Sequence, residues 1–196
     1  MAESGSRRPG KAAIMRGAVE VIGEDGYEGA STRDMAARAG VSVAALYHHF
    51  PSKLALLGEF VDEAYDVTLA RIERRLEGLD GSVSRLEEVV GTLIWTHLHD
   101  DFARLASVVA FREYVRLDAP ERAAIEVKRK ALLDLVEGIV VEGLRSGDFT
   151  ATETRETARA IVSLASSLVG VAGEMDLDLD EIIALYQGFS LRLVGA

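Results

Sequence analysis

The amino-acid sequence predicts an all-α fold of about nine helices. Its 196 residues include only 3 Pro, and Ala, Leu, Glu and Arg, which favour helices, are abundant. Apolar residues recur at helical spacing along most of the chain, whereas the alternation typical of a strand never persists. Apolar residues make up 48% of the sequence. A chain of this length and composition can bury roughly 70% of the surface that its unfolded form exposes.

Capping residues and glycines bound the first four helices. Ser31, Ser42 and Ser52 each precede a predicted helix, where a serine hydroxyl can accept a bond from a free backbone N–H group. Gly26 and Gly40 follow predicted helices, where glycine tolerates the left-handed conformation of a helix end. After a short basic arm at residues 1–10, helices are therefore expected over about residues 11–25, 32–39, 43–50 and 53–77.

The later helices have start signals of their own. Residues 84–87 (Ser-Arg-Leu-Glu) and 150–153 (Thr-Ala-Thr-Glu) have the spacing of a capping box. Pro120 suits the first turn of a helix, because its missing N–H group has no partner there. Helices are expected over about residues 84–97, 102–117, 120–145, 151–173 and 179–194.

Charge is distributed unevenly along the chain. The net charge is −10, which taken alone argues against a nucleic-acid partner. Residues 1–56 nevertheless carry a net charge of +1, with Arg7, Arg8, Lys11 and Arg16 close together, and the acidity lies in residues 57–196. Since DNA binding needs cations only where the phosphates run, the first segment remains compatible with it.

Residues 31–50 have the pattern of a helix-turn-helix. Two helices of about seven residues flank a tight turn at Gly40, Val41 and Ser42. Ala36 and Ala39 are small enough for the two helices to cross closely. The alternative is a tight corner in an otherwise ordinary helical protein.

This stretch resembles the TetR family of bacterial transcriptional regulators. The resemblance is detailed over about residues 11–57, and beyond them only the number and length of the helices match. It implies a DNA-binding domain at residues 1–52 and a helical ligand-binding and dimerisation domain at residues 53–196. The residues that match the family pattern are Thr32, Ala36, residues 39–42 (Ala-Gly-Val-Ser), residues 46–50 (Leu-Tyr-His-His-Phe), Ser52 and Lys53.

The predicted recognition helix begins with side chains that cannot make a bidentate hydrogen bond to a base. Val43, Ala44 and Ala45 offer only methyl groups, which suit thymine. Arg33 is then the best candidate for a guanine contact, because a guanidinium spans O6 and N7. The resemblance implies that Tyr47 and Lys53 hold the DNA backbone. The predicted DNA-binding residues are Ser31, Thr32, Arg33, Ser42, Val43, Ala44, Ala45, Tyr47, His48, His49 and Lys53.

Residues 161–173 are apolar or small on every side, so that a helix here must be buried on most of its faces. The resemblance implies that the last two helices form a four-helix bundle with a second copy, and a central core helix of a monomer is the alternative. The residues predicted at this dimer interface are Leu164, Ala165, Leu168, Val169, Leu185 and Phe189.

Two neighbouring helices concentrate the aromatic and polar side chains that a pocket for an apolar ligand requires. Ordinary core packing is the alternative. The resemblance implies a small-molecule effector, and an acyl-coenzyme A or another apolar metabolite both fit. Lys128, Arg129 and Lys130 form either a solvated helix face or a patch for a phosphate-bearing ligand. The predicted ligand-binding residues are Trp95, Leu98, His99, Phe111, Arg112 and Tyr114.

Other classes of function have less support. His97 and His99 point to different faces of a helix, and no third ligand is evident, so we expect neither a metal nor a cofactor. The chain has no Cys, which excludes disulfides and thiolate sites, and no set of nucleophile and base that would indicate an enzyme. No apolar run is long enough for a membrane span, and no signal peptide is evident, so we expect a cytoplasmic protein.

The sequence therefore predicts a ligand-responsive transcriptional regulator. It would act as a repressor that binds a palindromic operator as a homodimer and is released by a largely apolar effector. The lack of polar base readers at Val43, Ala44 and Ala45 keeps an alternative open, a helical scaffold that has lost DNA binding.

Overall fold

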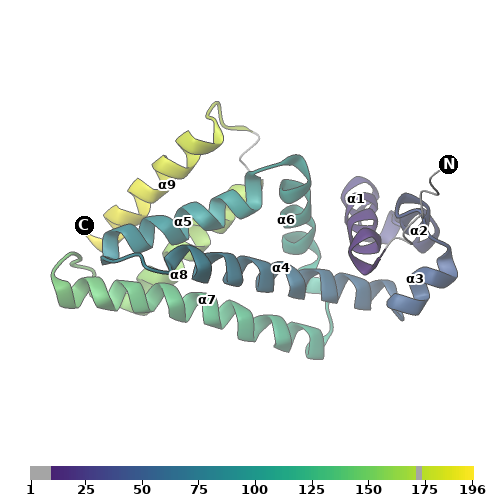
Figure 1. Ribbon diagram of the computed structural model, residues 1–196, viewed down its shortest axis with the longest axis horizontal. Helices are drawn as coiled ribbons and strands as arrows, with labels where there is room; N and C mark the ends of the chain where they lie inside the picture. The colour runs from purple at the N-terminus through teal and green to yellow at the C-terminus, as the bar shows by residue number, and fades with distance from the viewer. Residues whose placement is uncertain (1–9, 171–173) are drawn as a thin grey trace, which may run out of the picture.

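The computed structural model describes residues 10–170 and 174–196, and within these residues every regular element is a helix (Figure 1). The predicted all-α fold is confirmed. The basic side chains Arg7 and Arg8 lie outside the described residues. The α-helices are α1 (Lys11–Gly29), α2 (Thr32–Arg38), α3 (Val43–His49), α4 (Lys53–Leu76), α5 (Ser82–Leu98), α6 (Asp101–Glu113), α7 (Ala119–Ser146), α8 (Thr154–Ser167) and α9 (Leu179–Val194), with 3-10 turns at η1 (Tyr114–Arg116) and η2 (Leu168–Gly170).

The three predicted serine caps are confirmed. The hydroxyls of Ser31, Ser42 and Ser52 accept from backbone N–H groups three residues on, at 3.1, 3.1 and 3.0 Å. The helical path of α1 breaks at Gly26, whose φ of 73° is open to glycine at little cost. These local bonds fix where α2, α3 and α4 begin.

Two predicted capping boxes are wrong. Helix α5 begins at Ser82, so that residue 84 lies inside the helix. Helix α8 begins at Thr154, because the N–H group of Thr150 is bonded instead to the carbonyl of Val194 at 2.8 Å, which ties this turn to the C-terminal helix. Capping boxes occur at the starts of α7 and α9, where Asp118 and Asp178 are the caps.

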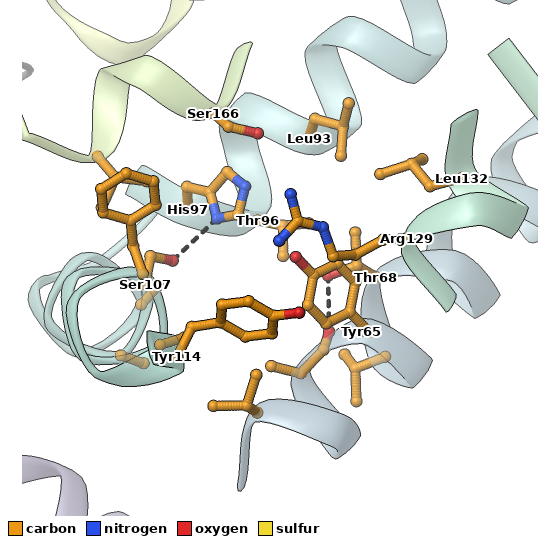
Figure 2. Close-up of a pocket in the computed structure, with 18 of the residues that line it drawn as sticks. Tyr65, Thr68, Leu93, Thr96, His97, Ser107, Tyr114, Arg129, Leu132 and Ser166 are labelled. Atoms are coloured by element: carbon orange, nitrogen blue, oxygen red, sulfur yellow. Dashed lines mark hydrogen bonds between the residues drawn. The ribbon is translucent and has the colours of Figure 1, made fainter. Parts of the chain in front are cut away.

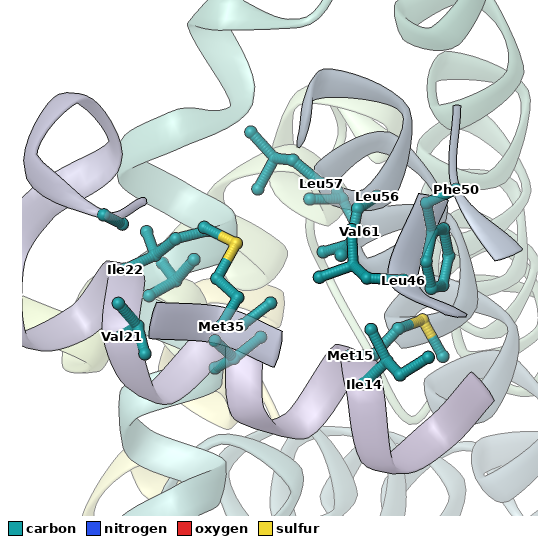
Figure 3. Close-up of a cluster of buried hydrophobic side chains, with 14 of the residues drawn as sticks. Ile14, Met15, Val21, Ile22, Met35, Leu46, Phe50, Leu56, Leu57 and Val61 are labelled. Carbon is teal, nitrogen blue, oxygen red and sulfur yellow. The ribbon is translucent and has the colours of Figure 1, made fainter. Parts of the chain in front are cut away.

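The first three helices and the start of α4 share one apolar core (Figure 3). Met35, Leu46 and Phe50 are at most 1% exposed and meet the buried face of α1. Helices α1 and α2 approach so closely that a Cβ atom on Gly17 would lie 2.9 Å from the backbone nitrogen of Ala39. The turn between α2 and α3 is thus held against a rigid support.

This core does not end at the predicted domain boundary after residue 52. It includes Val61 of α4 and, from later in the chain, Val109, Leu117 and Ile125. Helix α6 packs against α1, where a Cβ atom on Gly23 would overlap the side chain of Leu105. The division at residue 52 stays a prediction, and across it the two parts share packed side chains.

A second core joins α5, α7, α8 and α9 to the far half of α4. Helix α4 contributes to both cores, and its 24 residues correspond to a length of about 36 Å. Figure 1 shows α4 running beside α7 from the helix-turn-helix end toward the opposite end of the molecule. Among the described residues, no helix has both the length and the apolar character that crossing a bilayer requires.

Candidate DNA interface and ligand cavity

Helices α2 and α3 present one continuous exposed surface. Arg33 and His49 are exposed, and Tyr47 keeps 48% of its surface accessible. The hydroxyls of Thr32 and Tyr47 lie 3.4 Å apart, so that the start of α2 and the middle of α3 are neighbours. These side chains can reach a phosphate or a base without any rearrangement of the core.

The first turn of α3 offers methyl groups to this surface. Ala44 is exposed, and Val43 and Ala45 are half-buried. The exposed Ser42 uses its hydroxyl as the cap of α3. Direct hydrogen-bonded readout by this turn is therefore limited, in agreement with the side chains that the sequence places there. The remaining predicted residues, Ser31 and His48, are exposed at the start of α2 and the last turn of α3.

Lys53 lies beside this surface but is bonded within the protein. Its ammonium donates to the backbone carbonyl of Tyr27 and lies 4.1 Å from the centroid of the Tyr27 ring. Burial lowers the pKa of Lys53, against the attraction of Glu28. To bind a phosphate, as the family resemblance predicts, the ammonium has to leave the carbonyl of Tyr27.

The last turn of α1, after the break at Gly26, is tied to the far end of α6. Arg116 in η1 donates to Glu113 through Nε at 2.5 Å and to Glu28 through Nη1 at 2.5 Å, and its guanidinium lies 5.2 Å from the centroid of the Tyr27 ring. Glu113 is only 6% exposed. A continuous series of contacts thus runs from α6 through Arg116 and Tyr27 to Lys53.

A cavity of about 1350 Å³ lies between the first core, which Met15 and Val61 represent in its wall, and the second core, represented by Leu93 and Leu132 (Figure 2). Helices α1, α4, α5, α6, α7 and α8 all contribute to its wall. Of the predicted ligand-binding residues, His99, Phe111, Arg112 and Tyr114 line this cavity.

Trp95 and Leu98 were also predicted to bind the ligand. The structure corrects this prediction, because neither residue belongs to the cavity wall. Leu98 packs against the second core. Trp95 stacks on His99 with ring centroids 3.8 Å apart and is 38% exposed. Helix α5 turns Leu93, Thr96 and His97 toward the cavity, which directs Trp95 and Leu98 to other sides of the helix.

Several polar residues of the cavity have no local signal in the sequence. They come from different helices, and only packing brings them together (Figure 2). No motif spacing could have found them. They are Tyr65 and Thr68 of α4, Thr96 of α5, Ser107 of α6 and Ser166 of α8. Arg129 and Lys130 of α7, from the basic segment that the sequence offered as a patch for a phosphate-bearing ligand, also line the cavity.

Cationic side chains surround this cavity although the whole chain is acidic. Within residues 10–170 and 174–196, its wall contains seven arginine or lysine side chains and three carboxylates. Arg155 and Lys130 are neutralised by Asp134 at 2.5 and 2.6 Å.

Arg129 has a weaker partner, since Glu126 lies 3.6 Å away and also accepts from the hydroxyl of Tyr114. The guanidinium of Arg129 lies 5.2 Å from the centroid of the Tyr114 ring, and in Figure 2 it points toward the side of the cavity where His97 lies.

His97 is a half-buried titratable group of the cavity wall. Its Nδ1 lies 2.8 Å from the hydroxyl of Ser107, and burial lowers the pKa of His97 to about 4. His99 instead bonds the carbonyl of Trp95 at 2.9 Å. Among the described residues, no three His, Asp or Glu side chains gather as they would around a metal ion.

The predicted dimer interface divides into two sets of residues. Ala165, Leu168 and Val169 are at most 9% exposed within the single chain. These three residues pack inside their own subunit, which corrects the prediction that they contact a partner. Leu185 remains 37% exposed and Phe189 is partly exposed, both on α9.

Leu164 of α8 is also partly exposed. Leu177 and Leu193 are accessible as well, at 39% and 44%. An apolar surface toward a partner would therefore lie mainly on α9, with Leu164 added from α8.

Comparison with known proteins identifies the family. Residues 14–60 match the family model of bacterial regulatory proteins of the tetR family, and residues 80–170 match that of the tetracyclin repressor-like C-terminal domain. The chain is 30% identical over 137 residues to the HTH-type transcriptional regulator CymR of Pseudomonas putida. This alignment covers 69% of this chain and 68% of CymR.

Solved structures agree over nearly the whole length. A bacterial regulatory protein in the tetR family from Rhodococcus RHA1 superposes with a TM-score of 0.85 and 27% identity, over 95% of this chain and 97% of that one. AibR, solved in complex with isovaleryl coenzyme A and operator DNA, has the same fold, with a TM-score of 0.81 and 21% identity over 91% of this chain and 96% of AibR. The chain therefore belongs to the TetR family of bacterial transcriptional regulators.

Proposed function

We propose that this regulator is a repressor that binds a palindromic operator as a homodimer and leaves it when a largely apolar anion fills the cavity. The observation that carries the proposal is the position of α4. Its first residue, Lys53, stands beside the DNA-facing surface, and its residues Phe60, Tyr65 and Arg71 line the cavity. Since one helix belongs to both sites, a ligand that shifts α4 also moves Lys53.

Two half-sites of an operator require recognition helices about 34–36 Å apart. A ligand that binds more tightly to a dimer with another spacing would shift the population away from the DNA-binding state. The exposed apolar residues of α9, among them Leu185 and Leu193, support a dimer built on this helix. We infer from the family that the chain acts on the chromosome in the cytoplasm and is not an enzyme.

The charge of the cavity wall supports an anionic effector. A cavity of about 1350 Å³ exceeds the range of roughly 300–1,000 Å³ typical of ligand pockets. Arg129 offers a guanidinium that is only partly neutralised, and Leu93 and Leu132 supply apolar wall nearby. Since AibR was solved with an acyl-coenzyme A, an acyl-coenzyme A or a fatty acid is the class to test first.

Fluorescence anisotropy tests this function directly. The full chain is titrated against the intergenic DNA beside its own gene, with and without dodecanoate or dodecanoyl-coenzyme A. We expect salt-sensitive binding of this DNA and at least a fivefold loss of affinity with one of the two ligands, about the size of a typical allosteric coupling. If the DNA is not bound better than a scrambled duplex, the chain is a helical scaffold instead. If the ligands bind but DNA affinity is unchanged, the anionic-effector proposal is wrong.

We expect Arg116→Ala to weaken the coupling between cavity and DNA. Arg116 joins Glu113 of α6 to Glu28 in the last turn of α1, the turn that also holds Lys53. Its removal therefore leaves α6 free to move without this turn. The ratio of DNA dissociation constants with and without ligand should fall about threefold or more, within the usual range of coupling energies. Ligand affinity measured without DNA should stay within about twofold.

Arg104→Ala is the matched control for this variant. Arg104 also pairs with an acidic residue three positions earlier, Asp101, at 2.8 Å, but the two belong to the same exposed face of α6. This variant should keep the full ligand response. An equal loss of response in both variants would mean that any change in α6 disturbs the cavity, and Arg116 would have no special part.

A further inference from the structure

The polar groups of the cavity are of two different kinds. Arg129 is charged, whereas the pair formed by His97 and Ser107 is neutral. Burial alone accounts for the lowered pKa of His97, and no charged side chain contributes to the shift. His97 and Ser107 therefore form a neutral hydrogen-bonding position in the same wall as the cationic groups.

One ring nitrogen of His97 remains available to a ligand. Nδ1 is bonded to the hydroxyl of Ser107 at 2.8 Å. Figure 2 shows the second nitrogen on the opposite side of the ring, away from Ser107. No hydrogen bond to that nitrogen occurs among the described residues, and His97 is part of the cavity wall.

Two other hydroxyls on this wall are already bonded to the backbone of their own helices. Thr68 donates to the carbonyl of Ala64 at 2.8 Å, and Ser166 donates to the carbonyl of Val162 at 2.8 Å. Ser107 differs, because its bond is to His97 and not to its own helix. The two side chains orient each other and leave the imidazole ready for a third partner.

We propose that the effector carries an uncharged oxygen, a hydroxyl or a carbonyl, within its apolar body, and that His97 held by Ser107 binds it. This inference rests on the proposed function, with Arg129 holding the anionic group of the same molecule. A neutral imidazole has one N–H donor and one acceptor nitrogen. A hydroxyl can therefore bind it in either tautomer, and a carbonyl can accept from it when the free nitrogen carries the proton.

A plain alkyl chain fits this cavity less well. It would cover the free nitrogen of His97 without offering a hydrogen bond, and a buried polar group that loses its partner is costly. A site built around a hydrogen bond discriminates strongly against an analogue that lacks the bonding group. The His97–Ser107 pair thus selects oxygenated acids over saturated ones.

Isothermal titration calorimetry with the full chain tests this selection. The probes are dodecanoate and a series of hydroxydodecanoates with the hydroxyl at successive carbons. We expect at least one hydroxylated acid to bind about tenfold more tightly than dodecanoate, the effect of one buried hydrogen bond. His97→Leu should abolish this preference, Ser107→Ala should reduce it, and His97→Gln, which keeps a donor and an acceptor, should restore part of it.

Ser166→Ala is the matched control, because it removes a hydroxyl of the same wall that is bonded to its own helix. It should leave the ratio of the two affinities unchanged, whereas a merely structural role for His97 would lower both affinities together. If no hydroxylated acid binds more tightly than dodecanoate, or if His97→Leu keeps the ratio, the inference is wrong and the proposed function stands. If no acid of the series binds at all, this inference is wrong; the anionic-effector proposal fails with it only if dodecanoyl-coenzyme A does not bind either.

Discussion

Phe50→Ala is expected to destabilise the protein by about 3–5 kcal/mol, the usual loss when a fully buried phenylalanine is truncated. Phe50 is 1% exposed, and its ring packs into the core that joins α1, α3 and α4. Its backbone N–H group also bonds the carbonyl of Leu46 at the end of α3. Because the recognition helix rests on this ring, its loss should also loosen the DNA-facing surface. Thermal denaturation should show a decrease in Tm of the order of 10 °C.

Tyr47→Ala is the matched control, three residues earlier in the chain. Tyr47 is 48% exposed, and its hydroxyl lies on the exposed face near Thr32. We expect its stability to change by less than about 0.5–1 kcal/mol, while DNA affinity falls because the hydroxyl no longer binds a phosphate. If Tyr47→Ala lowers Tm as much as Phe50→Ala does, the assignment of one ring to the core and the other to DNA is incorrect.

Arg33→Ala and Lys53→Ala are expected to weaken DNA binding in two distinguishable ways. Arg33 is exposed at the start of α2 and is our candidate for a guanine contact. Its removal should cost about 1–3 kcal/mol on the operator and little on other DNA. Lys53→Ala should weaken binding to every sequence, and the slope of log K against log salt should decrease by about 1 for each phosphate that Lys53 neutralises.

Anisotropy titrations at several salt concentrations, on operator and scrambled duplexes, separate the two effects. Lys128→Ala is the control for the removal of a lysine, because Lys128 is bonded to Asp62 and Asp66, each at 2.7 Å, between α4 and α7. It should leave the salt slope unchanged. An unaltered slope in Lys53→Ala would show that Lys53 stays with the carbonyl of Tyr27 when DNA binds, and that it contributes only to the fold.

Lys53 illustrates how far a motif can predict the environment of a side chain. The motif predicts that Lys53 contacts the DNA backbone. In the structure, its ammonium is bonded instead to the carbonyl of Tyr27, which lies 26 residues earlier in the chain. The link from there to Arg116 crosses a further 88 residues of sequence, between Glu28 and η1. No spacing rule covers separations of this size, because such a contact depends on how α1 and α6 pack.

The sequence by itself determined the helix-turn-helix. Its boundaries depend on Ser31, Ser42 and Ser52, whose hydroxyls bond N–H groups three residues away, and on the turn at Gly40, whose φ is 68°. Each of these interactions involves near neighbours, so that local sequence is sufficient. The all-α class follows in the same way from helical spacing along the chain.

Only the tertiary structure decided which faces of the later helices are buried and which line the cavity. Helix α8 carries apolar or small residues on every side near its end, and such a pattern cannot show that Ala165 and Leu168 face inward. His97 and Ser107 meet across the corner between α5 and α6, and Arg129 joins their cavity from α7. The cavity is formed by six helices packing together, and the energy that sets their packing comes from side chains far apart in the sequence.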